Sequence, residues 1–512
     1  MAHRLTAILL VLAAPSLALT GAAHAQPAQE TPEAPTPEAV DALPPPPESE
    51  VDLMEVLRGE GRGWTADAAA TRAVETAPGV ERSQAAVRQA AAGAERALYG
   101  FIPQLTLSFR YTRLSEITNP SLIQGPDIDP DLIPAIVAGV DDPDARALWE
   151  QTLRAQAQLS SFSFPVILNQ LTFRASVQYP VSDVLLSILP AYESARTSEA
   201  AARLRVEAQE QDVALQARET FYNYARARAA LAVARTSLEQ AEARHAQVQA
   251  FVAAGTAARV DELRIRAQRA AAQVAVVRAE AGVEVGATAL RTLLHLPPGA
   301  AIAVGEDVLA PIPELDATAP QLVSRAIHRR RDVRAVRRLI RAAGYQVDAA
   351  EGSRYPHVAV AANLDVANPN NRVFPQSEEF RETWDVSAII TWSPHDLLNG
   401  EAQASEARAQ QAQARADLRS LEDAIRIQVT QAHADYEAAR LSLEAAQLGI
   451  EAAEESYRVQ MERYRAGAST VSDLIDASAE QIRAQLDLVN AAIDARVGRA
   501  RLTRAIGPEG ES

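Results

Sequence analysis

The spacing of apolar residues divides the chain into two kinds of segment. Six long segments contain almost no proline, are rich in strong helix formers and place apolar residues three and four positions apart, the period of an α-helix. In two of them the apolar positions form a narrow stripe, which favours coiled-coil-like packing. At 1.5 Å per residue, the two longest segments would each span about 90 to 100 Å. The predicted helical segments are residues 65–98, 192–254, 260–296, 319–350, 401–466 and 471–506.

Four segments between the helices alternate with a period of two, which predicts strands with one apolar and one largely polar face. Their length, about 9 to 11 residues, and the aromatic residues near their ends are typical of tilted transmembrane β-strands. We therefore predict an aromatic belt of Tyr111, Tyr179, Trp384 and Trp392. For any one strand, an ordinary antiparallel sheet with one face on a core is the more common explanation. The predicted strands are residues 102–112, 170–180, 356–366 and 383–392.

The chain is also a duplication. Gly255 and Gly467 each lie in a turn between two helical segments, and similar residues surround them, at an offset of 212 positions for the glycines and 211 for Leu263 and Leu474. Such turn glycines are expected to need a positive φ angle. A proline, Pro103 or Pro356, opens the first strand of each half. Each half is therefore helix, strand, strand, long helix, helix. We place the first repeat at 64–310, with a helical tip near 252–262, and the second at 311–507, with a tip near 464–473.

The two hairpins differ in length. The first contains about 40 extra residues, which include five prolines, and we expect a surface loop there with a short helix near residues 145–156.

The beginning of the chain predicts export. Arg4 precedes an apolar run and the cleavage pattern Ala23-His24-Ala25, so residues 1–25 are expected to be a signal peptide. The apolar run is shorter than the roughly 20 residues that a spanning helix needs. Residues 26–63 are rich in proline, glutamate and alanine and are expected to be flexible, and residues 508–512 form a short tail.

Composition excludes several classes of function. The chain has no cysteine, which excludes disulfides, thiol catalysis and the lipid-bearing cysteine of a bacterial lipoprotein. A formal net charge of −16 argues against a nucleic-acid partner. The histidines are scattered and phosphate-binding glycine loops are absent, so we predict no catalytic residue, cofactor or metal site. One basic stretch, His328 to Arg341, is expected to be an exposed helix face paired with acids.

Taken together, these features resemble the TolC-like outer-membrane efflux proteins. The most specific pieces are the tip segment 463–477, the strand-opening prolines, and the strand-to-helix turns 179–185 and 392–398. The resemblance implies a mainly α fold with a β-barrel portion, in a homotrimer. Each chain would give four strands to a twelve-stranded outer-membrane barrel and long helices to an antiparallel, coiled-coil-like periplasmic barrel. Four strands alone cannot close a barrel, since single-chain membrane barrels begin at about eight.

The same resemblance implies a function without enzymatic chemistry. The chain would be a passive channel subunit of a tripartite efflux or type I secretion system, surrounded by outer-membrane lipid. Its partners would be a periplasmic adaptor (membrane fusion) protein and an inner-membrane pump. In this family the pump selects the cargo, so the sequence does not identify it as drug, metal ion, lipid or protein.

The resemblance also assigns roles at the helix tips. The position of Tyr464 holds the closed gate by hydrogen bonding, and Asp473 and Asp476 match acidic positions that ring the constriction, where carboxylates attract cations. Ser469 stands where the family usually has arginine. Without the resemblance, Tyr464 could be a packing residue and the two aspartates a solvated helix start. The turns expected to contact the adaptor are Gly255-Thr256 and Gly467-Ala468.

A second class of function is a periplasmic coiled-coil adaptor or scaffold whose strands form a soluble sheet. Such adaptors usually have one helical hairpin bracketed by β-domains, whereas this chain has two tips and strands in each half. The order of the repeats therefore favours the channel.

Overall fold

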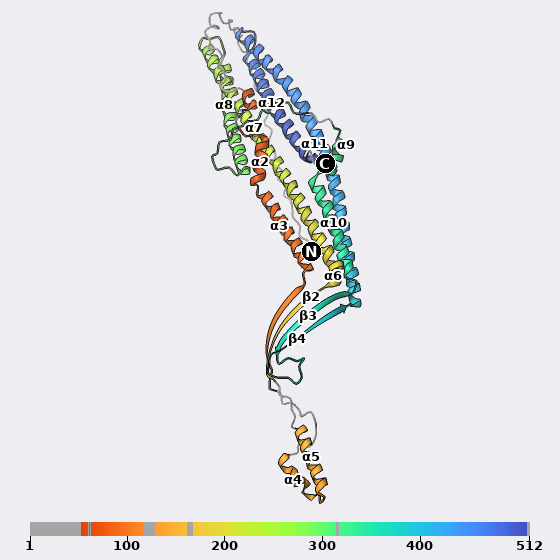
Figure 1. Ribbon diagram of the computed structural model, residues 1–512. Coiled ribbons are helices and arrows are strands. Elements are labelled where there is room, and N and C mark those ends of the chain that lie inside the picture. The colour runs from red at the N-terminus through yellow and green to blue at the C-terminus, as the bar shows by residue number, and fades with distance from the viewer. Residues whose placement is uncertain are drawn as a thin grey trace, which may run out of the picture. The chain divides into compact units, whose positions relative to one another are not determined.

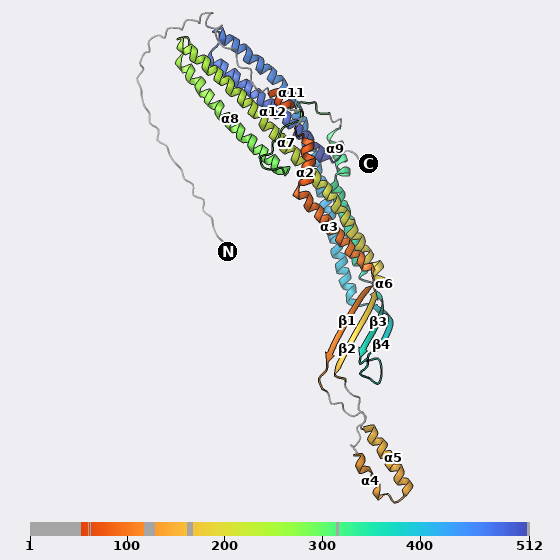
Figure 2. The same ribbon diagram turned by 60° about the vertical axis from the view of Figure 1, so that its left-hand side comes forward.

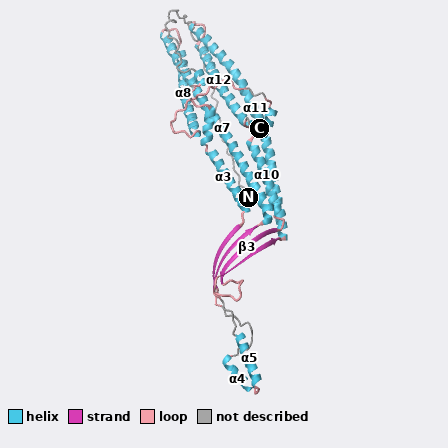
Figure 3. Cartoon of the chain, viewed as in Figure 1, coloured by secondary structure: helices cyan, strands magenta, loops and turns pink. Residues whose placement is uncertain are grey.

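The computed structural model describes residues 53–508 apart from 60, 62, 117–128, 161–166 and 314–316. The predicted signal peptide, most of the proline-rich segment and residues 509–512 lie outside the described residues. The described chain is mostly helical and holds a four-stranded antiparallel sheet (Figures 1 and 3), which confirms the predicted fold class. None of its described helices is both long and apolar enough to cross a bilayer.

The helices and strands follow the predicted order in each half. The first half comprises α1 (Leu53–Arg58), α2 (Ala66–Thr76), α3 (Pro78–Leu98), β1 (Gln104–Arg113), α4 (Ile133–Ile136), α5 (Pro143–Ser160), β2 (Asn169–Tyr179), α6 (Val181–Asp183), α7 (Leu189–Ala253) and α8 (Arg259–Leu293). The second half comprises α9 (Ala319–Arg329), α10 (Arg331–Gly352), β3 (His357–Asn368), β4 (Arg381–Thr391), α11 (Pro394–Arg465) and α12 (Val471–Ile506). Helices α7 and α8 form one antiparallel pair, and α11 and α12 form another (Figure 2).

Two of the predicted helical segments are broken, and a proline accounts for the first break. The segment 65–98 divides at Ala77, which has φ −69° and ψ 124°. The proline at position 78 disfavours the helical conformation of the residue before it and is well suited to begin the next helix. The segment 319–350 divides at Arg330, which has φ −58° and ψ 132°.

Arg330 also corrects the expectation that the basic stretch is wholly exposed. Its side chain is buried, and Nη2 lies 2.8 Å from a carboxylate oxygen of Asp332 while Nη1 donates to Gln428 at 2.7 Å. Burial of a guanidinium requires this kind of pairing. Arg337 behaves as expected, because it is exposed and pairs with Glu422, whereas Arg331 pairs with Glu207 but its side chain is only 15% exposed.

The described residues form two compact units, and each takes segments from both repeats. The tip unit comprises residues 233–278 and 451–483, and the body unit comprises 51–232, 279–450 and 484–512. The compact units therefore do not coincide with the repeats, and the repeat boundaries at 64–310 and 311–507 stay a prediction.

The body unit shows the duplication at the level of packing. Tyr224 and Tyr436, which lie 212 positions apart, are both buried in hydrophobic cores. Gly286 and Gly498, also 212 apart, face them: a Cβ on either glycine would lie 3.4 Å from the Cα of its tyrosine. In each repeat, the missing side chain lets the shorter helix approach the long helix closely.

The sheet is antiparallel, with the strand order β1-β2-β3-β4, and places the two hairpins side by side. Its register pairs Phe109 with Phe173 and Phe173 with Val366, and Leu364 with Trp384. Directly paired residues point to the same face, so the apolar positions of all four strands share one face of the sheet. The opposite face carries the polar positions.

The insertion in the first hairpin contains the expected helix as α5. Ile133 begins the short helix α4 and Val137 directly follows it. Both residues are buried, as is Ala157 of α5. Leu148 and Trp149 of α5 are exposed.

Candidate functional site

The two helical turns of the tip unit have the same structure. Gly255 and Gly467 have φ angles of +74° and +69°, as expected for glycines that end helices. The amide of the next residue, Thr256 or Ala468, donates to the carbonyl five positions earlier at 2.9 or 2.8 Å. The glycine amide donates three positions back, which completes a Schellman motif in both turns.

Tyr464 lies in the small hydrophobic cluster of the tip unit. Its ring contacts Phe251 edge-on, with centroids 6.4 Å apart, and it packs against the cluster of Val248, Ile265 and Val471. Burial, and then the nearby carboxylate of Asp261, raise the pKa of the Tyr464 hydroxyl. The side chain is therefore a neutral, half-buried group at the base of the turns.

Asp473 caps the start of α12. Its Oδ2 accepts hydrogen bonds from the amide and hydroxyl of Thr470 at 3.0 and 2.9 Å, and from the hydroxyl of Ser469 at 3.2 Å. The Thr470 hydroxyl accepts in return from the Asp473 amide at 3.2 Å, which forms a capping box. The bonds from Thr470 lower the pKa of the exposed Asp473 carboxyl. Ser469, at the family's arginine position, thus contributes to the cap.

Asp476, the other acid predicted for the second tip, is exposed one turn beyond Asp473. Sequence reasoning did not single out the acids of the first tip. On α8, Asp261 and Glu262 occupy the first turn, and Asp261 is near enough to Tyr464 to affect its hydroxyl. The repeat alignment, which matches Glu262 to Asp473, was the signal that could have found them.

The interior of the tip unit contains a buried arginine. Arg244 is 3% exposed, and its guanidinium lies over the ring of Tyr457 with 5.9 Å between the carbon and the centroid. Nε donates to the Gln240 carbonyl at 3.0 Å, whereas Nη1 and Nη2 have no hydrogen-bond partner among the described residues. Burial lowers the Arg244 pKa. The Ser478 hydroxyl, in the same unit, is also buried and has no hydrogen-bond partner in the part of the chain that the structure describes.

The apolar face of the sheet is open to its surroundings. Leu105, Leu107 and Phe109 of β1 are 61 to 71% exposed, and Ile390 of β4 is 72% exposed. A soluble chain rarely leaves a continuous apolar surface of this kind uncovered.

Three of the four residues predicted for the aromatic belt, Tyr111, Tyr179 and Trp384, lie on the same face, and Trp392 directly follows β4. Tyr179 and Trp392 stand at the helix end of the sheet, and Tyr111 and Trp384 lie toward the loop end. The Tyr111 hydroxyl donates to Asn169 at 3.1 Å.

The chain contains an outer membrane efflux protein domain. Residues 322–508 match the model of the outer membrane efflux protein family, which confirms the family resemblance. Comparison with curated protein sequences gives no match.

Solved structures of outer-membrane channels share the fold. The outer-membrane channel OprN matches with a TM-score of 0.68 and 18% identity, over 90% of this chain and 96% of that one. The Campylobacter jejuni CmeC outer membrane channel matches at 0.67 and 14%, over 94% of both chains. The open state of the Neisseria gonorrhoeae MtrE outer membrane channel matches at 0.68 and 16%, over 94% and 97%. The efflux-protein fold thus extends through nearly the whole chain.

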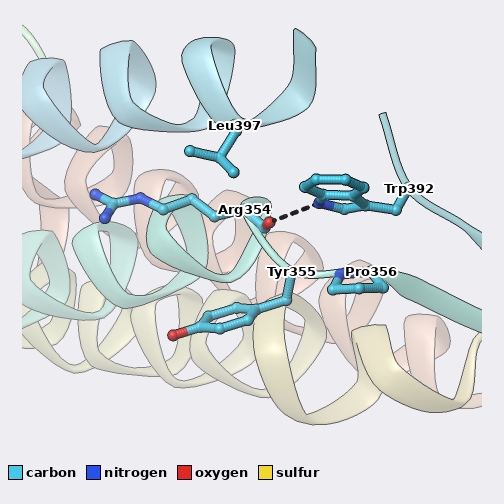
Figure 4. Close-up of a pocket in the computed structure, with 5 residues that line it drawn as sticks. All are labelled: Arg354, Tyr355, Pro356, Trp392 and Leu397. Carbon is cyan, nitrogen blue, oxygen red and sulfur yellow. Dashed lines mark hydrogen bonds between the residues drawn. The ribbon is translucent and has the colours of Figure 1, made fainter. Parts of the chain in front are cut away.

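In this efflux-protein fold, the strand-opening prolines lie where the chain passes from a helix into the sheet. Pro103 and Pro356 each precede the first strand of a hairpin by one residue. Pro356 lines a pocket of about 490 Å³ with Arg354, Tyr355, Trp392 and Leu397. Figure 4 shows the Trp392 indole nitrogen donating to the Arg354 carbonyl, at 3.3 Å. The indole thereby ties the end of β4 to the start of β3.

A second set of contacts ties the two hairpins together at the same end. The hydroxyl of Ser182 accepts from the Val358 amide at 2.7 Å, and His357 Nδ1 lies 2.6 Å from Asp183 Oδ1. These bonds connect the turn after β2 to the start of β3. Within the described residues, no group of three histidine, aspartate or glutamate side chains is placed to hold a metal ion.

Proposed function

We propose that this chain is one subunit of the outer-membrane channel of a tripartite efflux or type I secretion system. The observation that carries the proposal is the two-faced sheet in a chain with an efflux protein domain. Its exposed apolar face suits lipid and its polar face suits a water-filled lumen. The sheet lies in the outer membrane and the helices extend into the periplasm.

The sheet requires other copies of the chain to form such a channel. Within the described chain, β1 and β4 each pair along one edge only. Open sheet edges are not stable in hydrocarbon, because their amide and carbonyl groups have no water to bind. The partner is a second copy of the same chain, and three copies supply the twelve strands that the family resemblance implies.

The duplication supplies a register for this contact. The β1–β2 and β3–β4 hairpins have the same register when β1 is shifted by 253 positions onto β3 and β2 by 213 onto β4. The remaining seam inside the chain pairs β2 with β3, for example Val177 with Ala362. Moving β2 forward by 213 positions onto β4, and β3 back by 253 positions onto β1, gives the corresponding seam between β4 and the β1 of a neighbouring copy.

The resulting register brings Ile390 opposite Phe109 and Thr391 opposite Ser108 in the next copy. Ile390 and Phe109 both belong to the apolar face, and Thr391 and Ser108 to the polar face. A shift of one residue would put apolar side chains into the lumen. The agreement of faces supports this register.

Cysteine cross-linking tests the register directly, because the chain has no native cysteine. We expect Ser108→Cys with Thr391→Cys to form covalent trimers, since directly opposed Cβ atoms lie about 4.5–5.5 Å apart and a short reagent with two thiol-alkylating groups can join the two cysteines. Gel mobility of outer-membrane fractions gives the readout. Thr112→Cys with Thr391→Cys, displaced by four residues, is the matched control and should remain monomeric.

Two outcomes would contradict the proposal. Equal cross-linking of both pairs would overturn the register. A chain that purifies as a water-soluble monomer without detergent would favour the periplasmic adaptor or scaffold, in which the sheet is covered by protein.

The proposal includes a gate at the helix tips. Tyr464, Asp473 and Asp476 close the periplasmic end, with the aspartates forming carboxylate rings in the trimer. The exposure of both aspartates in the first turns of α12 supports this role. The turns Gly255-Thr256 and Gly467-Ala468 contact the periplasmic adaptor, which connects the channel to an inner-membrane pump.

A further inference from the structure

The polar face of the sheet carries a network of ion pairs near its loop end. Arg174 Nε donates to Asp365 Oδ1 at 2.5 Å, and the Asp365 side chain is only 8% exposed. On the neighbouring strand, Asn363 donates to Asp385 Oδ2 at 2.9 Å. The three strands β2, β3 and β4 are thus joined by side chains as well as by their backbones.

The loop between β3 and β4, residues 369–380, lies at the end of these strands that is farther from the long helices (Figures 1 and 2). At its base the buried Asn370 donates to the Arg381 carbonyl and the Thr383 hydroxyl at 3.0 and 3.1 Å. Its side-chain oxygen accepts from the Arg372 amide at 2.9 Å. Asn370 therefore fixes the path of the chain just before Arg372.

Arg372 connects the loop to the polar face. Its Nη2 donates to Asp385 Oδ1 at 2.6 Å and lies 3.7 Å from Asp365 Oδ2. The side chains of Arg372 and Asp385 are 46 and 33% exposed, whereas Asp365 is buried. Asp365 therefore serves the packing of the network, and the exposed pair presents its charges to solvent.

We propose that Arg372 and Asp385 determine the ion selectivity of the outer mouth of the channel, and that Arg372 holds loop 369–380 as a constriction there. The inference rests on the proposed function, in which the polar face lines the lumen and the loop end lies opposite the periplasmic helices. Three copies would place three opposed charge pairs around the bore. Rings of charged side chains set the selectivity of a narrow pore.

The two residues act in opposite directions, which makes the proposal testable by reciprocal substitutions. Arg372→Gln leaves Asp385 without its cation and releases the loop, so the trimer becomes more cation-selective and its conductance rises. Asp385→Asn leaves Arg372 uncompensated, so selectivity moves toward anions. The cation-to-anion permeability ratio is expected to shift in opposite directions for the two variants.

The measurement is the reversal potential and single-channel conductance of purified trimers in planar bilayers under a potassium chloride gradient. Arg113→Gln is the matched control, because Arg113 lies at the same end of the sheet but pairs with Asn169 on the apolar face. It should leave both quantities unchanged. Arg372→Lys keeps the charge and should retain the selectivity of the natural chain.

The outcomes separate the two levels of the proposal. If the natural chain forms no channel, the proposed function fails. If it forms channels and both reciprocal variants behave like Arg113→Gln, only the selectivity assignment is overturned. A shift of both variants in the same direction would also overturn it, because that result would reflect collapse of the loop and not the charge of each residue.

Discussion

The body unit and the tip unit are both built from paired helices of the two repeats, but their interiors differ. The body buries large apolar side chains completely, among them Phe221, Leu290 and Tyr436. The tip has a small buried cluster of Val248, Ile265 and Val471, and also buries polar groups such as Arg244 and Ser478.

The difference bears on the proposed gate, which needs a fixed scaffold and a part that can move. Extensive apolar burial fixes one arrangement of helices, because any displacement opens cavities. A thin apolar layer beside unpartnered polar groups gives up less when its helices move, and regions of this kind open at low free energy. The tip is therefore the part of the chain suited to gating.

The largest effect should come from the body. Tyr436→Ala removes a side chain that is 1% exposed and leaves a cavity in the second-repeat core. By comparison with other large-to-small core substitutions, we expect a loss of about 3–5 kcal/mol in the free energy of unfolding. The heat stability of the trimer on gels, together with thermal unfolding in detergent, gives the measurement.

The matched control is Tyr436→Phe. The Tyr436 hydroxyl is buried without a hydrogen-bond partner in the described chain, so its removal should be neutral or stabilising. If the alanine variant were as stable as the phenylalanine variant, the body would not be the fixed scaffold that the comparison requires.

Local patterns were sufficient to predict much of this fold. Period-two alternation located the strands, as with Leu105, Leu107 and Phe109, because a sheet with one apolar face imposes that period on each strand separately. The tip turns were equally visible, because Gly255 and Gly467 must adopt a positive φ. Both features depend on residues that are close together in the sequence.

The features that sequence reasoning missed depend on distant residues. Arg174 and Asp365 are 191 positions apart, and neither strand alone indicates that they pair. Arg330 appeared as part of an exposed basic face, but its partner Gln428 belongs to another helix. Arg244 lies within a long helical segment whose pattern does not mark it as buried, and only the packing of the tip unit buries it.

A substitution inside the tip sharpens the comparison. Arg244→Met replaces a buried, incompletely partnered cation with an apolar side chain of similar length. Replacing buried charged groups with apolar ones is often neutral or stabilising by about 1–4 kcal/mol. We expect slower hydrogen exchange in residues 233–278 and 451–483, and fewer channel openings, because the tip loses its polar interior.

Arg266→Met is the control, since Arg266 is an exposed residue of the same unit. It should change neither exchange nor opening. Faster exchange in the Arg244 variant would instead mean that the guanidinium finds a stabilising partner in the assembled trimer.

The smallest effect on stability, and the most specific effect on function, is expected at the gate. Tyr464→Phe keeps the ring contact with Phe251 and removes only the hydroxyl, while Asp473→Asn removes a charge and retains an oxygen for the Thr470 amide. If these groups close the tip, the double variant should conduct more than the natural chain in planar bilayers, with nearly unchanged thermal stability. An unchanged conductance would reject the gate assignment and leave Tyr464 as a packing residue.

Acid gives an independent test of the same carboxylate. The pKa of Asp473 is lowered in the folded chain, mainly by its hydrogen bonds with Thr470. Its contribution to the helix cap is therefore complete above the unfolded value of about 3.9 and is lost as the pH falls through the lower folded value. The part of the cation selectivity that Asp473 supplies should persist down to about pH 4 and disappear only below it. In the Asp473→Asn variant that step should be absent, whereas a step near neutral pH in the natural chain would point to a different group at the constriction.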